Sequence, residues 1–459
     1  MVDPRVVVVG AGPAGVRASE ILAAAGLRPT VIDEARRCGG QIYRQQPENF
    51  VRAIDTLYGT ETAKARSVHA AFEALRDRIQ YRAETFAWNV VDGQLHVESG
   101  GAKAALPFDA LIIASGATDR VMPVPGWTLP GVYSLGAAQI AVKAHACSIG
   151  RNVAFMGTGP LLYLVAYQYV KAGANVAAIL DTSTIAERLA ALPALTARLD
   201  NVFKGLSYLR HLRGRHIPIF NGVTPVEISG ADGKGVTSVS ALRRGGRRLE
   251  IKCDAIGLGY HLRAETQLAD LARCAFKFDL SSRQWLPEID EDGRTSSKGI
   301  YLAGDGAQIL GADGAEIRGR LAAYAVLRDF GHAVPDDTVA LLRRQLHRIE
   351  RFSRGLARAF PWPSKLVEAL PDDTVICRCE TIRAGELRGS ARLKGAWEVN
   401  RAKAFSRVGM GRCQGRYCGH AAAEVLAASA GVPIEEVGRL RSQAPVKPLS
   451  IATIDGAIR

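Results

Sequence analysis

One stretch near the N-terminus constrains the fold most strongly. Residues 5–35 read RVVVVGAGPAGVRASEILAAAGLRPTVIDEA, which predicts a strand, a glycine loop, a helix and a second strand. Gly10, Gly12 and Gly15 have the spacing of a dinucleotide-binding loop, which allows a tight turn, close approach of a pyrophosphate and close helix–strand packing. The helix N-terminus would then offer unpaired N–H groups to the phosphates. Asp33 ends the second strand, where a carboxylate can accept ribose hydroxyls.

A second stretch repeats this pattern imperfectly. Residues 150–183 read GRNVAFMGTGPLLYLVAYQYVKAGANVAAILDTS. Gly157 and Gly159 occupy the first two glycine positions, but Leu162 stands at the third, where a leucine should hold helix and strand apart and disturb the pyrophosphate cradle. Asp181 ends the second strand of the repeat and disfavours a 2′-phosphate. The alternatives for this fold are NAD(H), another nucleotide such as ATP, or no ligand.

Three further stretches carry a resemblance to a known family. They are CGGQIYR at 38–44, FDALIIASGATDR at 108–120 and GIYLAGDGAQ at 299–308. In this order after the first loop, they resemble the flavoproteins with two dinucleotide folds. The resemblance implies that the first loop holds the ADP half of FAD, that an Ala-Ser-Gly turn passes beneath it, and that a late Gly-Asp contacts the ribityl chain and pyrophosphate. The FAD-binding residues implied are Gly10, Gly12, Pro13, Ala14, Gly15, Asp33, Glu34, Gly40, Gln41, Ala114, Ser115, Gly116, Gly304 and Asp305.

Four of the eight cysteines are isolated along the chain. No C-x-x-C pair occurs, so dithiol reductase chemistry, which needs two near-vicinal thiols beside the flavin, is disfavoured. Cys38, just before two glycines, is expected to be a packed side chain rather than a redox thiol. The isolated cysteines are Cys38, Cys147, Cys253 and Cys274.

The other four cysteines form a C-x-C-x33-C-x4-C pattern near the C-terminus. They are Cys377, Cys379, Cys413 and Cys418. Four thiolates from two loops can hold zinc or an iron–sulfur cluster, but structural zinc sites favour C-x2-C pairs, which are missing here. The pattern resembles the helical [2Fe–2S] module of bacterioferritin-associated ferredoxins, and its cationic surroundings suit an anionic cluster. We therefore predict a [2Fe–2S] site, with zinc or plain buried thiols as the alternatives.

Composition and charge exclude several classes. The formal net charge is +14, and residues 340–459 hold 21 Lys and Arg against 11 Asp and Glu. No aromatic-rich RNA motif or recognition helix accompanies this charge, so we predict no nucleic-acid binding. No apolar run suits a transmembrane segment, and no basic leader precedes the first strand. We expect a cytoplasmic protein, with peripheral association at the inner membrane as a further option.

The expected fold class is α/β: a flavoprotein with two dinucleotide folds and a small helical C-terminal module. A helix is predicted from about 335 to 360, with an apolar face that includes Leu341 and Leu342, and PWP at 361–363 ends it. The predicted units are an FAD-binding domain over 1–120 and 286–335, an NAD(P)-binding-like domain over 121–285, a helical linker over 336–371, the [2Fe–2S] module over 372–435 and a tail over 436–459.

Over nearly its full length the chain resembles one family of heteromeric oxidoreductase subunits. The motifs are GGQIYRQQP, LPGVYSLGAAQ, GTGPLLYLVA and the C-terminal cysteine pattern. The family comprises one subunit of hydrogen cyanide synthase, the A subunits of octopine and nopaline oxidases, and the alpha subunits of dye-linked (hydroxy)proline dehydrogenases. In that family a separate subunit of the amino-acid-oxidase type oxidises the carbon–nitrogen bond.

The resemblance implies an oxidoreductase subunit that takes electrons from CH–NH donors oxidised in its partner. FAD accepts electrons in pairs and a [2Fe–2S] cluster passes them singly, here to an acceptor such as a quinone-linked carrier. An interface flavin such as FMN and a third small subunit are further options, and no catalytic base is assigned in this chain. The alternatives are a self-contained NADH-dependent reductase and a metal-handling protein that uses the cysteine module.

Overall fold

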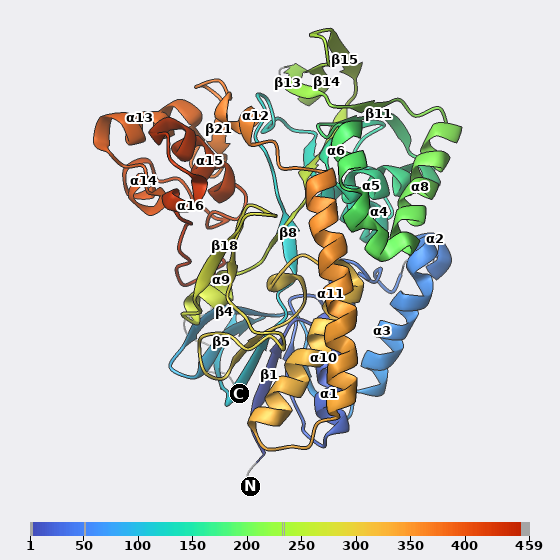
Figure 1. Ribbon diagram of the computed structural model, residues 1–459, viewed down its shortest axis with the longest axis vertical. Helices are drawn as coiled ribbons and strands as arrows, with labels where there is room; N and C mark the ends of the chain where they lie inside the picture. The colour runs from blue at the N-terminus through green and yellow to red at the C-terminus, as the bar shows by residue number, and fades with distance from the viewer. Residues whose placement is uncertain (1–2, 50–51, 232, 234, 451–459) are drawn as a thin grey trace.

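The computed structural model describes residues 3–49, 52–231, 233 and 235–450. The half of the molecule nearest the N-terminus is built on a parallel sheet of apolar, buried strands (Figure 1). In spatial order these strands are β20 (Ile300–Leu302), β7 (Ala110–Ile113), β1 (Val6–Val9), β2 (Thr30–Ile32) and β3 (Gln80–Arg82). All four neighbouring pairs are parallel.

Successive side chains of β1 face two different layers. Val6 and Val8 pack against helices, and Val7 and Val9 pack against a small antiparallel sheet. The helices are α1 (Pro13–Ala24), α3 (Thr62–Ala74) and α10 (Gly311–Asp329), and the small sheet consists of β4 (Thr85–Val91), β5 (Gln94–Ser99) and β6 (Ala102–Pro107). A Cβ atom on Gly319 of α10 would lie 2.1 Å from the carbonyl oxygen of Ala14, so this glycine lets α10 cross α1 closely.

The second half contains another five-stranded parallel sheet. In spatial order it consists of β12 (Ile219–Asn221), β11 (Asn175–Asp181), β10 (Asn152–Thr158), β16 (Ala255–Tyr260) and β9 (Val132–Ser134). One face is covered by α4 (Leu135–Ala144), α5 (Pro160–Lys171) and α8 (Leu199–Gly214). The antiparallel strands β13 (Thr224–Ala231), β14 (Gly235–Leu242) and β15 (Arg248–Lys252) pack against the other face. Two dinucleotide folds in one chain confirm the predicted fold class.

Two features join the halves. The chain enters the second half through β8 (Ala117–Asp119) and returns to the first through β17 (Leu262–Ala264), and these two strands pair antiparallel. Helix α11 (Asp336–Ala359) runs along both halves (Figure 1). Shorter elements are α2 (Ile54–Tyr58), η1 (Gly59–Glu61), α6 (Ile185–Ala190), α7 (Leu192–Leu195), η2 (Thr196–Arg198), α9 (Gln267–Leu271), β18 (Phe276–Asp279), β19 (Gln284–Pro287) and η3 (Gly304–Gly306).

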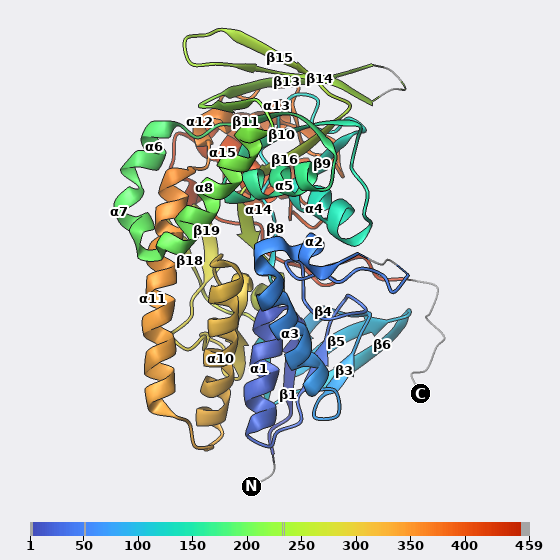
Figure 2. The ribbon, with the colours of Figure 1, turned by 90° about the vertical axis from the view of Figure 1, so that its right-hand side faces the viewer.

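The C-terminal module is mainly helical and docks on both halves (Figures 1 and 2). It consists of α12 (Ser364–Glu368), the antiparallel pair β21 (Val375–Cys377) and β22 (Ile382–Arg383), α13 (Ala384–Lys394), α14 (Val399–Ser406), α15 (Gly419–Ala430) and α16 (Ile434–Val437). The indole N–H of Trp127 donates to the Val375 carbonyl at 2.6 Å. Ion pairs Arg283–Glu424 at 2.9 Å and Arg439–Asp270 at 2.6 Å reinforce the docking.

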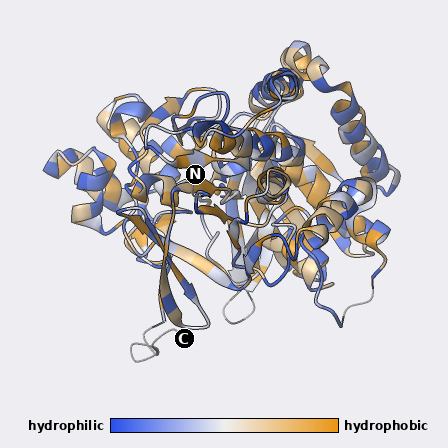
Figure 3. Cartoon of the chain, turned by 90° about the horizontal axis from the view of Figure 1, so that it is seen from below, coloured by the Kyte–Doolittle hydropathy of each residue, from blue (hydrophilic) through white to orange (hydrophobic). Residues whose placement is uncertain are grey.

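Hydrophobic residues concentrate on the central strands, whereas hydrophobic and hydrophilic residues alternate along the surrounding helices (Figure 3). The predicted long helix forms as α11, but Leu341 does not belong to its apolar face and is 47% exposed. Leu342 is buried and Leu341 is not, because neighbouring positions on a helix point in different directions.

The domain boundaries stay a prediction. Leu268 and Cys274, assigned to the inserted domain, pack in one cluster with Val7 and Val9 of the first. Within the described ranges no helix is long and apolar enough to cross a membrane.

Candidate functional site

The first glycine loop has the geometry of a phosphate cradle. Gly10 has φ +102°, and a Cβ atom there would lie 2.5 Å from the Ala114 carbonyl oxygen. A Cβ atom on Gly15 would lie 1.8 Å from the Gly10 carbonyl oxygen, so α1 meets its own loop at a distance that only glycine permits. At Gly12 a Cβ atom would meet only ordinary contacts, the nearest being the Gly40 Cα atom at 3.6 Å. The backbone amides at the start of α1 therefore face open space beside Gly12.

The two acidic residues after β2 have different contacts. The Asp33 carboxylate accepts hydrogen bonds from the backbone N–H groups of Ala11 at 2.6 Å and Ala35 at 2.7 Å, so it fixes the glycine loop. Burial nevertheless raises the pKa of Asp33. Glu34 is exposed and forms an ion pair with Lys447. Of the two carboxylates, Glu34 is thus the one that is free of backbone amides, and the assignment of the ribose to Asp33 stays a prediction.

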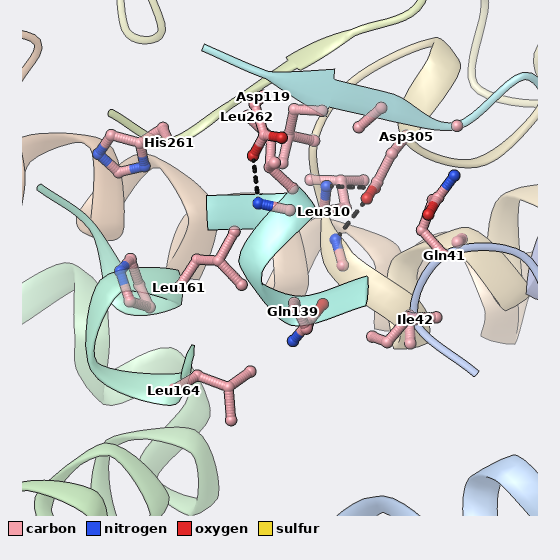
Figure 4. A pocket seen from close by; sticks show the side chains of 18 of the residues that line it. Gln41, Ile42, Asp119, Gln139, Leu161, Leu164, His261, Leu262, Asp305 and Leu310 are labelled. Atoms are coloured by element: carbon pink, nitrogen blue, oxygen red, sulfur yellow. Dashed lines mark hydrogen bonds between the residues drawn. The ribbon is translucent and has the colours of Figure 1, made fainter. Parts of the chain in front are cut away.

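The later motifs close the cradle. Ala114, Ser115 and Gly116 follow β7 directly, beside the end of β1. A Cβ atom on Gly304 would lie 2.8 Å from the Ala14 Cβ atom, so the late glycine also allows close packing on α1. Both the Leu310 and Gly311 N–H groups donate to the Oδ1 atom of Asp305, at 2.8 and 3.1 Å (Figure 4). The carboxylate thus fixes the start of α10.

A cavity of about 1750 Å³ contains these motifs and continues into the second half. Gln41 and Ile42 lie at one end, Gln139 lies across the middle, and Leu161, Leu164 and His261 lie at the other end (Figure 4). The predicted FAD-binding residues that line it are Gly10, Gly12, Pro13, Ala14, Asp33, Glu34, Gly40, Gln41, Ala114, Ser115, Gly116, Gly304 and Asp305. Gly15 is not in the lining, because it packs beneath the loop.

The second glycine loop has a different environment. Gly157 and Gly159 are not in the cavity lining. A Cβ atom on Gly159 would meet the imidazole ring of His261 at 3.2 Å, and this ring also hydrogen-bonds the Phe360 carbonyl oxygen. Burial lowers the pKa of His261 to about 4, so the ring is neutral near pH 7. Leu162 is fully buried among the helices of this half. His261 therefore stands in front of the second loop, where the first loop is open.

Asp181, which the sequence pattern predicts to disfavour a 2′-phosphate, does not line the cavity. Its side chain is fully buried and accepts hydrogen bonds from Thr158 at 2.9 Å and Tyr163 at 2.7 Å. Arg188 closes the group with an ion pair at 2.6 Å, and its guanidinium lies over the rings of Tyr163 and Phe360. The Asp181 carboxylate thus has its hydrogen-bond and ion-pair partners inside the protein.

The four C-terminal cysteines come together from two loops. Cys377 ends β21 and Cys379 follows it, while Cys413 and Cys418 lie on the loop before α15, whose N-cap is Cys418. The Cys418 thiol lies close to those of Cys377 and Cys413, and the Cys379 thiol lies close to that of Cys413.

The Cys418 contact lowers the pKa of Cys377 to about 6 and that of Cys413 to about 5, although burial opposes both shifts. Backbone amides, including that of Gly409 at Cys377 and those of Gly415 and Tyr417 at Cys413, favour the thiolates further.

The spacing of the four thiols bears on what they could hold. In the described part of the chain no three His, Cys, Asp or Glu side chains form a group that could hold a metal ion. The thiols nevertheless contact one another in series. A [2Fe–2S] centre takes four thiolates in two pairs, one pair for each iron, and therefore does not require convergence on one point. The cysteines fit such a centre, and the first glycine loop fits a flavin dinucleotide.

A C-terminal segment reaches back to the first cradle. Val446 is buried, its N–H donates to the Trp88 carbonyl oxygen of β4 at 3.2 Å, and Lys447 pairs with Glu34. Arg416 lies on the loop from Cys413 to Cys418, called the cysteine loop below, and donates to the Val446 carbonyl oxygen at 2.8 Å. Figure 1 shows this segment descending from α16 towards β4.

Sequence reasoning missed several residues that line the cavity. Arg416, Val446, Lys447 and the buried Lys143 all contribute to the lining. Lys143, Val446 and Lys447 belong to no local motif, and Arg416 lies inside the C-x4-C pair, whose pattern assigns it no role. The glycine-rich surroundings of Cys413 were the only signal near any of them.

Comparisons with known proteins agree with this geometry. The profile of the pyridine nucleotide-disulphide oxidoreductase family matches residues 4–326, and that of the sarcosine oxidase A3 domain matches residues 389–457. The chain is 37% identical to the A subunit of opine oxidase from Agrobacterium tumefaciens (strain Ach5), over 97% of this chain and 90% of that protein. It is 31% identical to the HcnB subunit of hydrogen cyanide synthase from Pseudomonas protegens, over 96% of each.

A solved structure supports the fold. The crystal structure of L-proline dehydrogenase from P. horikoshii superposes with a TM-score of 0.70 at 19% identity, covering 98% of this chain and 79% of that one. The similarity extends through the cysteine module, whereas the pyridine nucleotide-disulphide profile ends before it. The chain therefore belongs to the pyridine nucleotide-disulphide oxidoreductase family, as an oxidoreductase related over nearly its whole length to the opine oxidase and hydrogen cyanide synthase chains named above.

Proposed function

We propose that this chain is the electron-transfer subunit of a heteromeric amino-acid or opine dehydrogenase. A partner flavoprotein of the amino-acid-oxidase type oxidises a carbon–nitrogen bond, and this chain passes the electrons to a respiratory or dye acceptor. The observation that carries the proposal is the placement of the cysteine module. Arg416 and Tyr417 of the cysteine loop line the same cavity as Ser115 and Gly116. Ser115 and Gly116 belong to the Ala-Ser-Gly turn at residues 114–116, called the flavin turn from here on. A flavin and a cluster held there would be neighbours.

The residues present suit both cofactors. When bound, FAD supplies two-electron acceptance and a [2Fe–2S] centre supplies one-electron transfer. Gly12 and the N-terminus of α1 would hold the pyrophosphate. Glu34 would accept a ribose hydroxyl, and the Oδ2 atom of Asp305 would face the FAD chain, since its Oδ1 atom takes two backbone amides. The four thiols, two with lowered pKa, would bind the irons as thiolates.

The alternative of a self-contained NADH-dependent reductase is less well supported. His261 stands in front of Gly159, and Arg188 satisfies Asp181. Neither the pyrophosphate nor the ribose of NADH would meet the groups that usually bind them. A metal-handling role would leave the FAD cradle without a use. We propose that the second fold holds no catalytic nicotinamide.

A surface beside the cavity suits a partner protein. Apolar side chains on α6–α8 are exposed, including Phe203 at 66% and Ile185 and Leu189 at 60%. Ile185, Leu189 and the neighbouring Leu206 also line the cavity, so a partner covering them would lie over its mouth. The opine oxidase and hydrogen cyanide synthase relatives, which match this chain over nearly its full length, are both named as subunits. We propose that the partner flavoprotein docks here, in the cytoplasm or peripheral to the inner membrane.

The experiment is to purify the chain with its native partner and to assay both forms. Imine or keto-acid formation from a panel of amino acids and opines would be followed with an artificial dye as acceptor. We expect no oxidation by the chain alone and oxidation by the complex. Robust oxidation by the isolated chain, or rapid reduction of its flavin by NADH, would contradict the proposal.

A further inference from the structure

A short segment separates the flavin turn from the cysteine loop. Residues 262–267 comprise β17 and the approach to α9. On one side, the Glu265 N–H donates to the Gly116 carbonyl oxygen at 3.0 Å, and the Ser115 hydroxyl donates to the Glu265 carbonyl oxygen at 2.6 Å. The backbone of Glu265 is therefore bonded directly to the Ala-Ser-Gly turn.

Side chains from alternate residues of the same segment reach the other way. Arg263 donates to the Arg416 carbonyl oxygen at 2.8 Å, and Gln267 donates to the Gln414 carbonyl oxygen at 2.9 Å. Between them, the Glu265 carboxylate accepts from Arg416 Nε at 2.7 Å. Arg263 lies on β17 and Gln267 begins α9, with Glu265 between them, and all three side chains meet the loop between Cys413 and Cys418.

The contacts are buried and charged. The side chains of Glu265 and Arg416 are only 13% and 10% exposed. Burial alone would raise the pKa of Glu265, but the guanidinium groups of Arg416 and Arg263 hold it below its usual value. Arg416 also donates to the Cys413 carbonyl oxygen at 3.4 Å. One ion pair thus connects the backbone of the flavin turn to the backbone that carries a cysteine.

We infer that Arg263, Glu265 and Gln267 position the cysteine loop against the flavin turn, and that the Glu265–Arg416 pair fixes the spacing across which single electrons pass. The inference rests on the proposed function. With FAD and the cluster bound, each transfer would take one electron from the reduced flavin and convert one ferric iron to ferrous. The flavin proton would go to water in the cavity, and a one-electron dye or quinone-linked carrier would re-oxidise the cluster. Glu265 is a positioning residue here and takes no electron itself.

The test compares two ion pairs that tether the same module. Glu265→Gln removes the charge at the cysteine loop. Asp270→Asn removes it at Arg439, where Asp270 also accepts from the Ser442 N–H at 2.6 Å, beyond the last cysteine. For each full-length variant, FAD and iron contents, the paramagnetic resonance signal of the dithionite-reduced cluster and hydrogen–deuterium exchange of residues 411–418 would be measured. The rate of cluster reduction after photoreduction of the flavin completes the set.

We expect Glu265→Gln to keep its FAD and iron, to exchange faster over 411–418, and to transfer electrons roughly tenfold or more slowly, as for other misplaced reacting groups. Asp270→Asn should transfer at the parent rate. Parent-like transfer in Glu265→Gln, or equal slowing in both variants, would overturn the inference.

If Glu265→Gln loses a cofactor, Arg416→Lys serves instead. It keeps the charge but lacks the guanidinium fork, and the same direction of change is expected. Parent-like transfer in Arg416→Lys would overturn the inference too. A parent protein without iron contradicts the proposed function. Exchange over 411–418 in that iron-free protein would still decide the positioning role, which parent-like exchange in Glu265→Gln would exclude.

Discussion

Changing Gly12 to alanine should impair FAD binding, whereas changing Gly15 to alanine should impair folding. At Gly12 the backbone has φ −75° and ψ −177°, which alanine adopts freely, and the new Cβ atom would be 3.6 Å from its nearest neighbour. Because Gly12 is the N-cap of α1, the substitution should cost folding at most about 1 kcal/mol. At Gly15 the Cβ atom would lie 1.8 Å from the Gly10 carbonyl oxygen, so the loop must move, at a cost of roughly 1–3 kcal/mol or more.

Gly12→Ala, the milder substitution for folding, should nevertheless strongly weaken the binding of FAD. A methyl group beside the start of α1 would occupy the space proposed for the pyrophosphate. Losing two charge-assisted hydrogen bonds at about 1.5–3 kcal/mol each would weaken binding by roughly 10²–10⁴-fold. Gly12→Ala should therefore give a stable apoprotein that binds FAD poorly, whereas Gly15→Ala should give an unstable apoprotein.

The assay combines thermal unfolding of the apoproteins with fluorescence titration of FAD. Gly389→Ala is the matched control, because Gly389 lies on α13 and a Cβ atom there meets nothing within 4 Å. We expect this control to match the parent in FAD affinity. The reasoning is refuted if Gly12→Ala binds FAD within about threefold of the parent, or if the two apoproteins with loop substitutions unfold at the same temperature.

Three other expectations follow from the same structure. Replacing any one of the four clustered cysteines with serine should lose or destabilise the iron while FAD stays, as measured by metal analysis and absorbance; stoichiometric zinc in anaerobically purified parent would contradict this. NADH should reduce the flavin far more slowly than an ordinary turnover of about 10 per second, as followed by stopped-flow absorbance. Phe203→Asp should release the partner flavoprotein during size-exclusion chromatography without changing FAD content, and retention of the partner would place the interface elsewhere.

The sequence was sufficient for the parts of the site that are made locally. The first loop, Gly10 to Gly15, depends on contacts within a few residues and with the next strand, so its spacing predicts its shape. The four cysteines were found because a two-loop thiol pattern is a local signal. The different contacts of Asp33 and Glu34 could not be predicted, because neighbouring carboxylates differ only in which backbone amides they meet.

The second fold shows why long-range contacts escape pattern reading. Leu162 marked the loop as unusual, but what stands before the loop is His261, about a hundred residues later in the chain. Arg188 fills the place beside Asp181 from a helix that the strand pattern does not specify. The ion pair between Glu265 and Arg416 could not be predicted either, since a single acidic residue after a short strand forms no recognisable motif.

The ion pair between Glu34 and Lys447 has a consequence for biosynthesis. These two residues are 413 positions apart, yet both line the flavin cavity. Domains fold during synthesis, N-terminal parts first, so the glycine cradle forms long before its last wall has been translated. A chain truncated within the cysteine module would have a cradle that lacks both Val446 and Lys447. We therefore expect a chain that ends before Val446 to hold FAD less firmly than the full-length chain, because one wall of the cavity would be missing.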